Sequence, residues 1–341
     1  SWDNEKPIYA FERIGSGTFA SLYRNIRKGQ DIWAIDMIEA DEFRRSMYSK
    51  YKRKGWDMEK KYTFTASSGL EFSLNLEQIM SLYAYSKRKQ AHDHLLKGGI
   101  VFDGETEVTE TKNGIKRTYL VEDATAYKIS DETLADIVSK LNADQKAFVD
   151  DMQDYLSTTM GNKGNHVSMK MYGIKLFKEK FYFPLRSAGQ YKERAREADL
   201  QKEQGQISMA NSGFTKTAIP NASNPVVLSG FMDVWAEHVN DMSNYHAFVL
   251  PMEDFRRVYN YKTPNLEGED SASVVEAIQN AHGTAATAYI DQLYRDLNGG
   301  AVSDPRENFG KKMTGLFKKG AVMASASVVF QQPSAIVRAF A

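Results

Sequence analysis

The residues best suited to chemistry gather in residues 44–61, where basic side chains alternate with aromatic rings. This segment holds eight Lys and Arg residues against two acidic ones, a net charge of +6. Cations neutralise phosphates and aromatic faces stack on unpaired bases, so the segment has the composition of a single-strand nucleic-acid site. The alternative, which the sequence favours, is a solvated helix face whose aromatic residues belong to the core. The candidate nucleic-acid-binding residues are Arg44, Arg45, Lys50, Tyr51, Lys52, Arg53, Lys54, Trp56, Lys60 and Lys61.

A second pattern resembles the glycine loop of a protein kinase and the strand that follows it. Gly15 and Gly17 lie in the run IGSGTFASLY, and WAID follows at residues 33–36. A kinase needs a lysine where this chain has Asp36, and neither an HRD-type loop nor a DFG triplet follows. We therefore expect Gly15 and Gly17 to kink or interrupt a helix and not to bind a nucleotide.

A possible metal site lies on one helix, where Glu237, His238 and Asp241 could share a face with a fourth ligand such as His246. The same residues also fit the polar side of an amphipathic helix, whose core face would carry Trp235, Val239 and Met242. We favour the second interpretation and predict no metal or other cofactor.

Catalytic motifs do not appear in the sequence. It contains no GxSxG, HExxH, Walker A or paired-carboxylate motif, and the absence of cysteine excludes thiolate catalysis, disulfides and Cys-ligated zinc. Lys and Arg (44) balance Asp and Glu (44), so a nucleic acid would have to meet a local basic patch. We expect a chain without enzymatic activity, although a site built from distant residues would escape motif analysis.

The 341 residues, 42% hydrophobic and 26% charged, are sufficient for one large or two modest globular units. The longest low-charge stretch, residues 320–330, is well short of the ~20 residues that span a bilayer, so we expect no transmembrane helix and a cytoplasmic location. The chain starts without Met and stops without a polar tail, and we expect it to be part of a longer protein.

Hydrophobic periodicity predicts a mainly α protein, a multi-helix bundle in two lobes with small β-hairpin insertions. A helix is expected over residues 31–54, ending at Gly55, and further helices begin at the caps Asn75, Asn142 and Asp304. Hairpins are expected at residues 63–74 and 101–121. Three long C-terminal helices are expected over residues 226–250, 271–297 and 304–330.

Residues 187–225 are rich in Gly, Ser, Asn, Gln and charged side chains and lack a periodic apolar face. We predict a loop or linker there. It would separate an N-terminal helical lobe, residues 1–186, from a C-terminal helical bundle, residues 226–341.

Three stretches carry a family resemblance: LNLEQIMSLYAYSKR at residues 74–88, YFPLR at 182–186 and ASVVFQQPS at 326–334. Together they resemble the helical accessory domains of large polyvalent proteins of bacteriophages and conjugative elements. The resemblance implies a very long parent protein whose modules enter the host cell with the DNA, and it carries over no catalytic residue.

From this resemblance we expect a non-enzymatic helical scaffold or protein-interaction module. Its partners would be other domains of the parent, or phage and host proteins, in the bacterial cytoplasm or a packaged virion. The alternative is a nucleic-acid-binding module that accompanies the incoming DNA.

Overall fold

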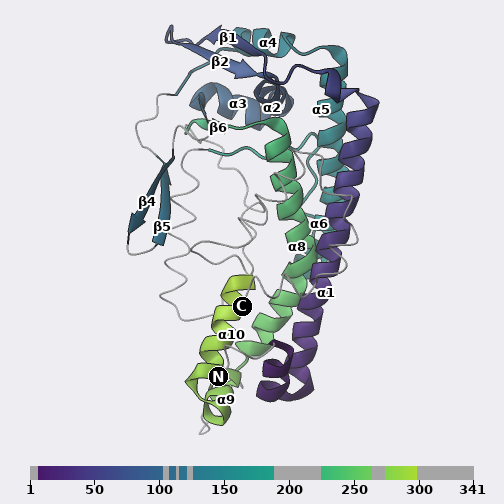
Figure 1. Cartoon of the computed structure of the whole chain (residues 1–341), viewed down its shortest axis with the longest axis vertical. Helices are drawn as coiled ribbons and strands as arrows, with labels where there is room; N and C mark the ends of the chain where they lie inside the picture. The colour runs from purple at the N-terminus through teal and green to yellow at the C-terminus, as the bar shows by residue number, and fades with distance from the viewer. Residues whose placement is uncertain are drawn as a thin grey trace.

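The computed structural model describes residues 7–102, 107–112, 115–120, 126–187, 224–262 and 273–297. This part of the chain is mainly helical with small two-stranded sheets, which confirms the predicted class. Two long helices, α1 (Pro7–Lys50) and α8 (Phe231–Tyr259), lie side by side along the long axis of the molecule and run in opposite directions (Figure 1).

An apolar stripe on α1 explains this pairing. Tyr23, Ile26, Trp33, Met37 and Ala40 are buried and recur at intervals of a helix face. The two backbones approach closely at Gly29, where an added Cβ would lie 2.6 Å from the carbonyl oxygen of Ala247 on α8. The predicted helix over residues 31–54 is thus the second half of a longer one that includes Gly15 and Gly17, so these glycines do not interrupt it. The first turns of α1, in the darkest purple, nevertheless bend away from its straight part (Figure 1).

A third rod completes the bundle. It consists of α5 (Ala143–Tyr155), a π-helical turn (Leu156–Met160) and α6 (Gly161–Tyr172). Asn142 starts this rod with a capping box, because its side chain accepts from the Gln145 amide and the Gln145 side chain accepts from the Asn142 amide, both at 2.9 Å. The predicted cap at Asn142 is confirmed, as is the equivalent cap at Asn75.

Short elements cover the upper end of the rods (Figure 1). The antiparallel strands β1 (Lys61–Thr65) and β2 (Glu71–Asn75) confirm the hairpin predicted near residues 63–74. The helices there are α2 (Leu76–Ser86), α3 (Lys89–Gly98) and α4 (Asp131–Ser139). A short 3-10 helix (Arg53–Gly55) joins α1 to this end.

The second predicted hairpin is shorter than expected. It consists of strands β4 (Glu107–Lys112) and β5 (Ile115–Leu120). Strand β3 (Ile100–Phe102) is not part of this hairpin and pairs in parallel with β6 (Val226–Leu228). The sequence did not predict this parallel pair, because its strands are far apart in the chain. Residues 226–228 were expected to be helical, and this expectation is wrong.

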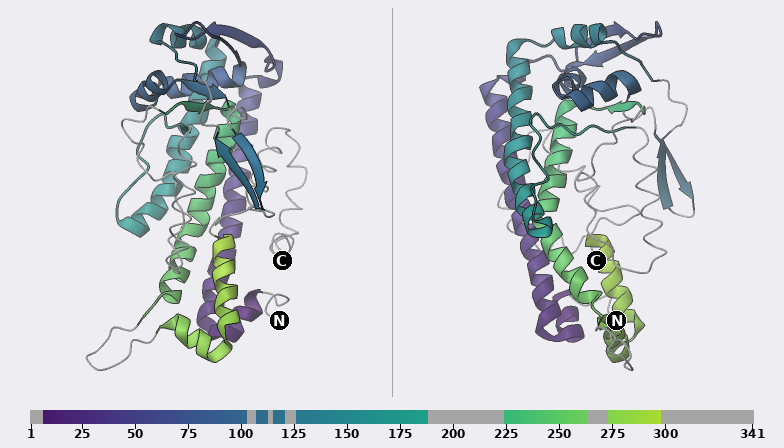
Figure 2. Two further views of the ribbon diagram at one scale, coloured as in Figure 1. Left: turned by 90° about the vertical axis from the view of Figure 1, so that its left-hand side faces the viewer. Right: turned by 180° about the vertical axis from the view of Figure 1, so that it is seen from behind.

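At the lower end, α9 (Val274–His282) and α10 (Thr284–Leu297) lie near the ends of α1 and α8 (Figure 2). Gly283, with a φ of 81°, ends α9 and divides the single helix predicted over residues 271–297. The helix predicted over residues 304–330 lies outside the described residues.

The side chains form two main hydrophobic clusters, one in the upper part and one at the lower end. The upper cluster includes Trp33 and Trp235, and the lower one includes Phe19 and Phe255, so α1 and α8 contribute to both. The predicted linker lies almost wholly outside the described residues. Residues before the predicted linker and residues after it nevertheless contribute to both clusters. The boundary between the two clusters therefore lies part-way along α1 and α8, and not at the linker.

None of the helices in the described part of the chain combines the length and the apolar character needed to cross a membrane.

Candidate interaction surface

The first two candidate nucleic-acid-binding residues are engaged within their own helix. Arg44 is only 2% exposed and its guanidinium lies 2.6 Å from the Asp41 carboxylate. Arg45 reaches the other oxygen of Asp41 at 2.7 Å. The Asp41 carboxylate therefore neutralises part of the positive charge of Arg44 and Arg45, which the sequence had suggested for binding phosphates.

Lys50 and Tyr51 both contact Asp151 on α5. The Lys50 ammonium and the Tyr51 hydroxyl each donate to the same oxygen of Asp151 at 2.7 Å. Desolvation alone would raise the pKa of Asp151, but the hydrogen bonds from Lys50 and Tyr51 outweigh it and hold that pKa below its usual value. The contact joins the end of α1 to the third rod.

Arg53 and Trp56 pack against the upper core. The Arg53 guanidinium pairs with Glu77 and lies 4.6 Å from the ring centre of Tyr48. Trp56 meets Phe148 edge to face, with ring centres 5.4 Å apart. These two side chains thus occupy positions that the core interpretation predicts.

Four lysines of the candidate set remain on the surface: Lys52, Lys54, Lys60 and Lys61. Within the described part of the chain none of the four has an ion pair, although the Lys60 ammonium lies 5.0 Å from the ring centre of Tyr62. The structure therefore divides the ten candidates into internally bonded residues and a smaller exposed group. Nucleic-acid binding by the exposed group stays a prediction.

The residues of the possible metal site take separate roles. Glu237 pairs with Arg186, and His238 is buried beside the ring of Tyr182 at 5.0 Å. Burial lowers the pKa of His238 to about 4, so its ring is neutral at pH 7. His246 turns toward α1, and no group of metal ligands occurs among the described residues.

Asp36 is the centre of a polar cluster that the sequence did not reveal. It is 2% exposed, and its two oxygens lie 2.5 Å from Lys163 on α6 and 2.7 Å from His246 on α8. Lys163 also reaches Glu39 at 2.5 Å. Desolvation opposes the charge on Lys163, but the hydrogen bonds that its ammonium donates to Asp36 and Glu39 raise its pKa. The residue that breaks the kinase pattern thus fastens α6 to the two long helices.

Beyond this attachment the chain exposes an unusual run of side chains. The α6 helix ends at Gly173, whose φ of 71° suits a glycine, and the chain then turns back along the rod (Figure 2). We call residues 169–181 the 169–181 surface. Its exposed apolar members are Met169, Tyr172, Ile174, Leu176 and Phe181. Its exposed lysines are Lys170, Lys175, Lys178 and Lys180.

The middle of this surface is held by Asn165 on α6. Its side-chain amide donates to the Phe177 carbonyl at 2.7 Å, and its side-chain oxygen accepts from the Phe177 amide at 2.9 Å. The Phe177 ring turns inward against Tyr245, with ring centres 5.7 Å apart. Next to it, Gly164 leaves the space the ring needs, because an added Cβ would lie 2.6 Å from that ring.

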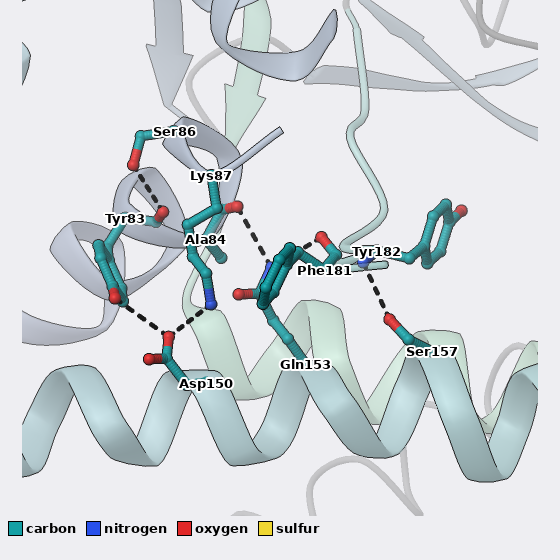
Figure 3. A network of polar contacts seen from close by, with 9 residues as sticks. All are labelled: Tyr83, Ala84, Ser86, Lys87, Asp150, Gln153, Ser157, Phe181 and Tyr182. Atoms are coloured by element: carbon teal, nitrogen blue, oxygen red, sulfur yellow. Dashed lines mark hydrogen bonds and ion pairs between the residues drawn. The ribbon is translucent and has the colours of Figure 1, made fainter. Parts of the chain in front are cut away.

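A second anchor holds the end of the surface, as Figure 3 shows. Gln153 on α5 donates to the carbonyls of Ala84 at 3.2 Å and of Phe181 at 3.1 Å. The hydroxyl of Ser157 accepts from the Tyr182 amide at 3.0 Å. The returning chain is therefore held to the rod at Phe177 and again at Phe181 and Tyr182.

The same network sets the position of the Phe181 ring (Figure 3). Asp150 accepts from Lys87 at 2.5 Å and from the Tyr83 hydroxyl at 3.1 Å. Burial, with the nearby charge of Asp150, raises the pKa of Tyr83 to about 12. Lys87, fixed in this way, lies 4.4 Å from the Phe181 ring centre and leaves that ring half exposed, at 49%.

A search against protein-family models, a search of curated proteins and a search of solved structures found no match to this chain. The sequence contained a signal for the surface, because residues 169–181 alternate lysines with apolar residues. Its exposure could not be foreseen, since it depends on the anchors from α5 and α6.

Proposed function

We propose that this chain is a helical scaffold module that binds another protein through the 169–181 surface. The observation that carries the proposal is the exposure of Ile174 at 55%, Met169 at 45% and Leu176 at 37% within one short stretch. Aliphatic side chains held in water on a surface fixed from both ends are typical of a protein-binding site. In the context that the resemblance implies, the partner would be another domain of a polyvalent protein or a phage or host protein.

The alternative partner, a nucleic acid, fits this surface less well. Aliphatic side chains offer neither charge nor stacking to an unpaired base. Two rings are exposed on the surface, and the Lys87 ammonium already lies against Phe181, which leaves Tyr172 to stack on a base. The surface therefore favours a protein over a nucleic acid.

Site-specific photo-crosslinking in the producing cell tests this function. A photoreactive amino acid at position 174 should give a discrete adduct with a second protein. The matched control is position 35, since Ile35 is 48% exposed on α1 and lies outside the surface. Equal adducts at both positions, or no protein adduct at position 174, would refute the proposal.

A further inference from the structure

The lysines of the 169–181 surface differ from four of the eight cations of residues 44–61. Arg44, Arg45, Lys50 and Arg53 all have carboxylate partners. In contrast, Lys170, Lys175, Lys178 and Lys180 are exposed, and none has an ion pair with any residue that the structure describes.

The acidic residue within the surface does not cancel this charge. The Glu179 carboxylate forms an ion pair at 2.9 Å with Arg88, the residue that precedes α3. The four lysines thus leave a local positive field on a chain whose formal net charge is zero. Such a field selects a partner of opposite charge and accelerates its association.

The apolar residues define the rest of the partner. Ile174 and Leu176 are exposed and lie two residues apart with Lys175 between them, whereas Phe177 turns inward. Residues 174–181 of the returning chain belong to no helix or strand.

From these observations we infer that the 169–181 surface binds an acidic, amphipathic segment of the partner protein. Leucine, isoleucine or phenylalanine side chains of that segment contact Ile174 and Leu176, and its carboxylates pair with the lysines. This inference rests on the proposed function and adds the chemistry of the partner.

Selection from a displayed library of random peptides against the full chain tests the inference. Enriched peptides should contain Asp and Glu in excess over the library, interspersed with large apolar residues. A synthetic peptide of the enriched sequence should bind several-fold more weakly when NaCl is raised from about 50 to about 300 mM, because exposed charges are screened.

Two pairs of variants locate the binding site. The triple variant K175E/K178E/K180E should weaken peptide binding at least tenfold. The triple variant K52E/K54E/K61E introduces the same change of charge on another exposed surface and should alter binding less than twofold. Likewise, Ile174→Asp should weaken binding about tenfold, and Ile35→Asp should leave it unchanged. Circular dichroism of all four variants identifies any that fail to fold.

Several outcomes would overturn the inference. These are no enrichment, enrichment without an acidic excess, equal losses in the two triple variants, or displacement of the peptide by a single-stranded oligonucleotide. A protein adduct at position 174 together with peptides that lack an acidic excess would leave the proposed function standing and remove only the partner chemistry.

Discussion

Arg53 offers the sharpest test of whether the basic aromatic segment serves the fold. The Arg53 and Glu77 side chains are 10% and 19% exposed, so their ion pair is largely removed from water. Glu77 also accepts a hydrogen bond at 2.9 Å from the amide of Met232, in the first turn of α8. One carboxylate therefore neutralises the guanidinium and satisfies a free amide at the start of a long helix.

Glu77→Ala should consequently lower the free energy of unfolding. Removing one member of a buried pair costs about 3–5 kcal/mol, and the partial exposure of both groups lowers the expected loss to about 2–4 kcal/mol. For a chain of this size each kcal/mol lowers Tm by roughly 2 °C, so a fall of about 4–8 °C is expected. Arg53→Met should destabilise by a similar amount, and the double variant by less than the sum, because neither charge is then left alone.

Thermal and urea unfolding followed by circular dichroism measure these changes. Arg45→Met is the matched control: the side chain of Arg45 is 45% exposed, and Asp41 keeps its contact with Arg44. The control should cost less than about 1 kcal/mol. If Arg53→Met and Arg45→Met lowered Tm equally, or if Arg53→Met kept full stability but lost affinity for single-stranded DNA, the structural role of Arg53 would be refuted.

Three further variants test other contacts. Gly164→Val should lower stability by about 1–3 kcal/mol, because the added methyl groups meet the Phe177 ring, and hydrogen exchange should accelerate near residue 177. Trp56→Ala should lower Tm by several degrees through lost contact with Phe148, while the salt dependence of any binding to single-stranded DNA stays unchanged. The pKa of His238, lowered to about 4, predicts stability that is complete above pH 6.5 and decreases by up to about 3 kcal/mol as pH falls toward 4. In urea titrations at each pH, His238→Phe should remove that part of the pH dependence.

The sequence predicted those features that depend on neighbouring residues. The caps at Asn75 and Asn142 were foreseen because a cap and its partner are three residues apart. The β1–β2 hairpin was foreseen because its two strands are joined by a short turn. Neither feature requires knowledge of the rest of the chain.

Contacts between distant segments could not be foreseen. The polar cluster joins Asp36 to Lys163 and His246, which are more than a hundred residues away from it. A buried carboxylate and an exposed one are the same letter in the sequence, and only the packing of α1 against α6 and α8 distinguishes them. For the same reason the sequence placed Asp36 in a kinase-like motif and Glu237, His238 and Asp241 at a possible metal site.

The two basic segments show why local charge does not identify a binding surface. Residues 44–61 have the larger excess of basic residues in the sequence, yet Asp41, Asp151 and Glu77 neutralise much of it from the neighbouring structure. Around α6, the carboxylates of Asp36 and Glu39 are occupied by Lys163, and Glu179 by Arg88, so none of them reaches the lysines of the 169–181 surface. Desolvated and paired charges contribute to the fold, whereas exposed and unpaired ones remain available to a partner. Because the unpaired lysines lie beside Ile174 and Leu176, a protein that contacts these two side chains would also meet the charge of the lysines.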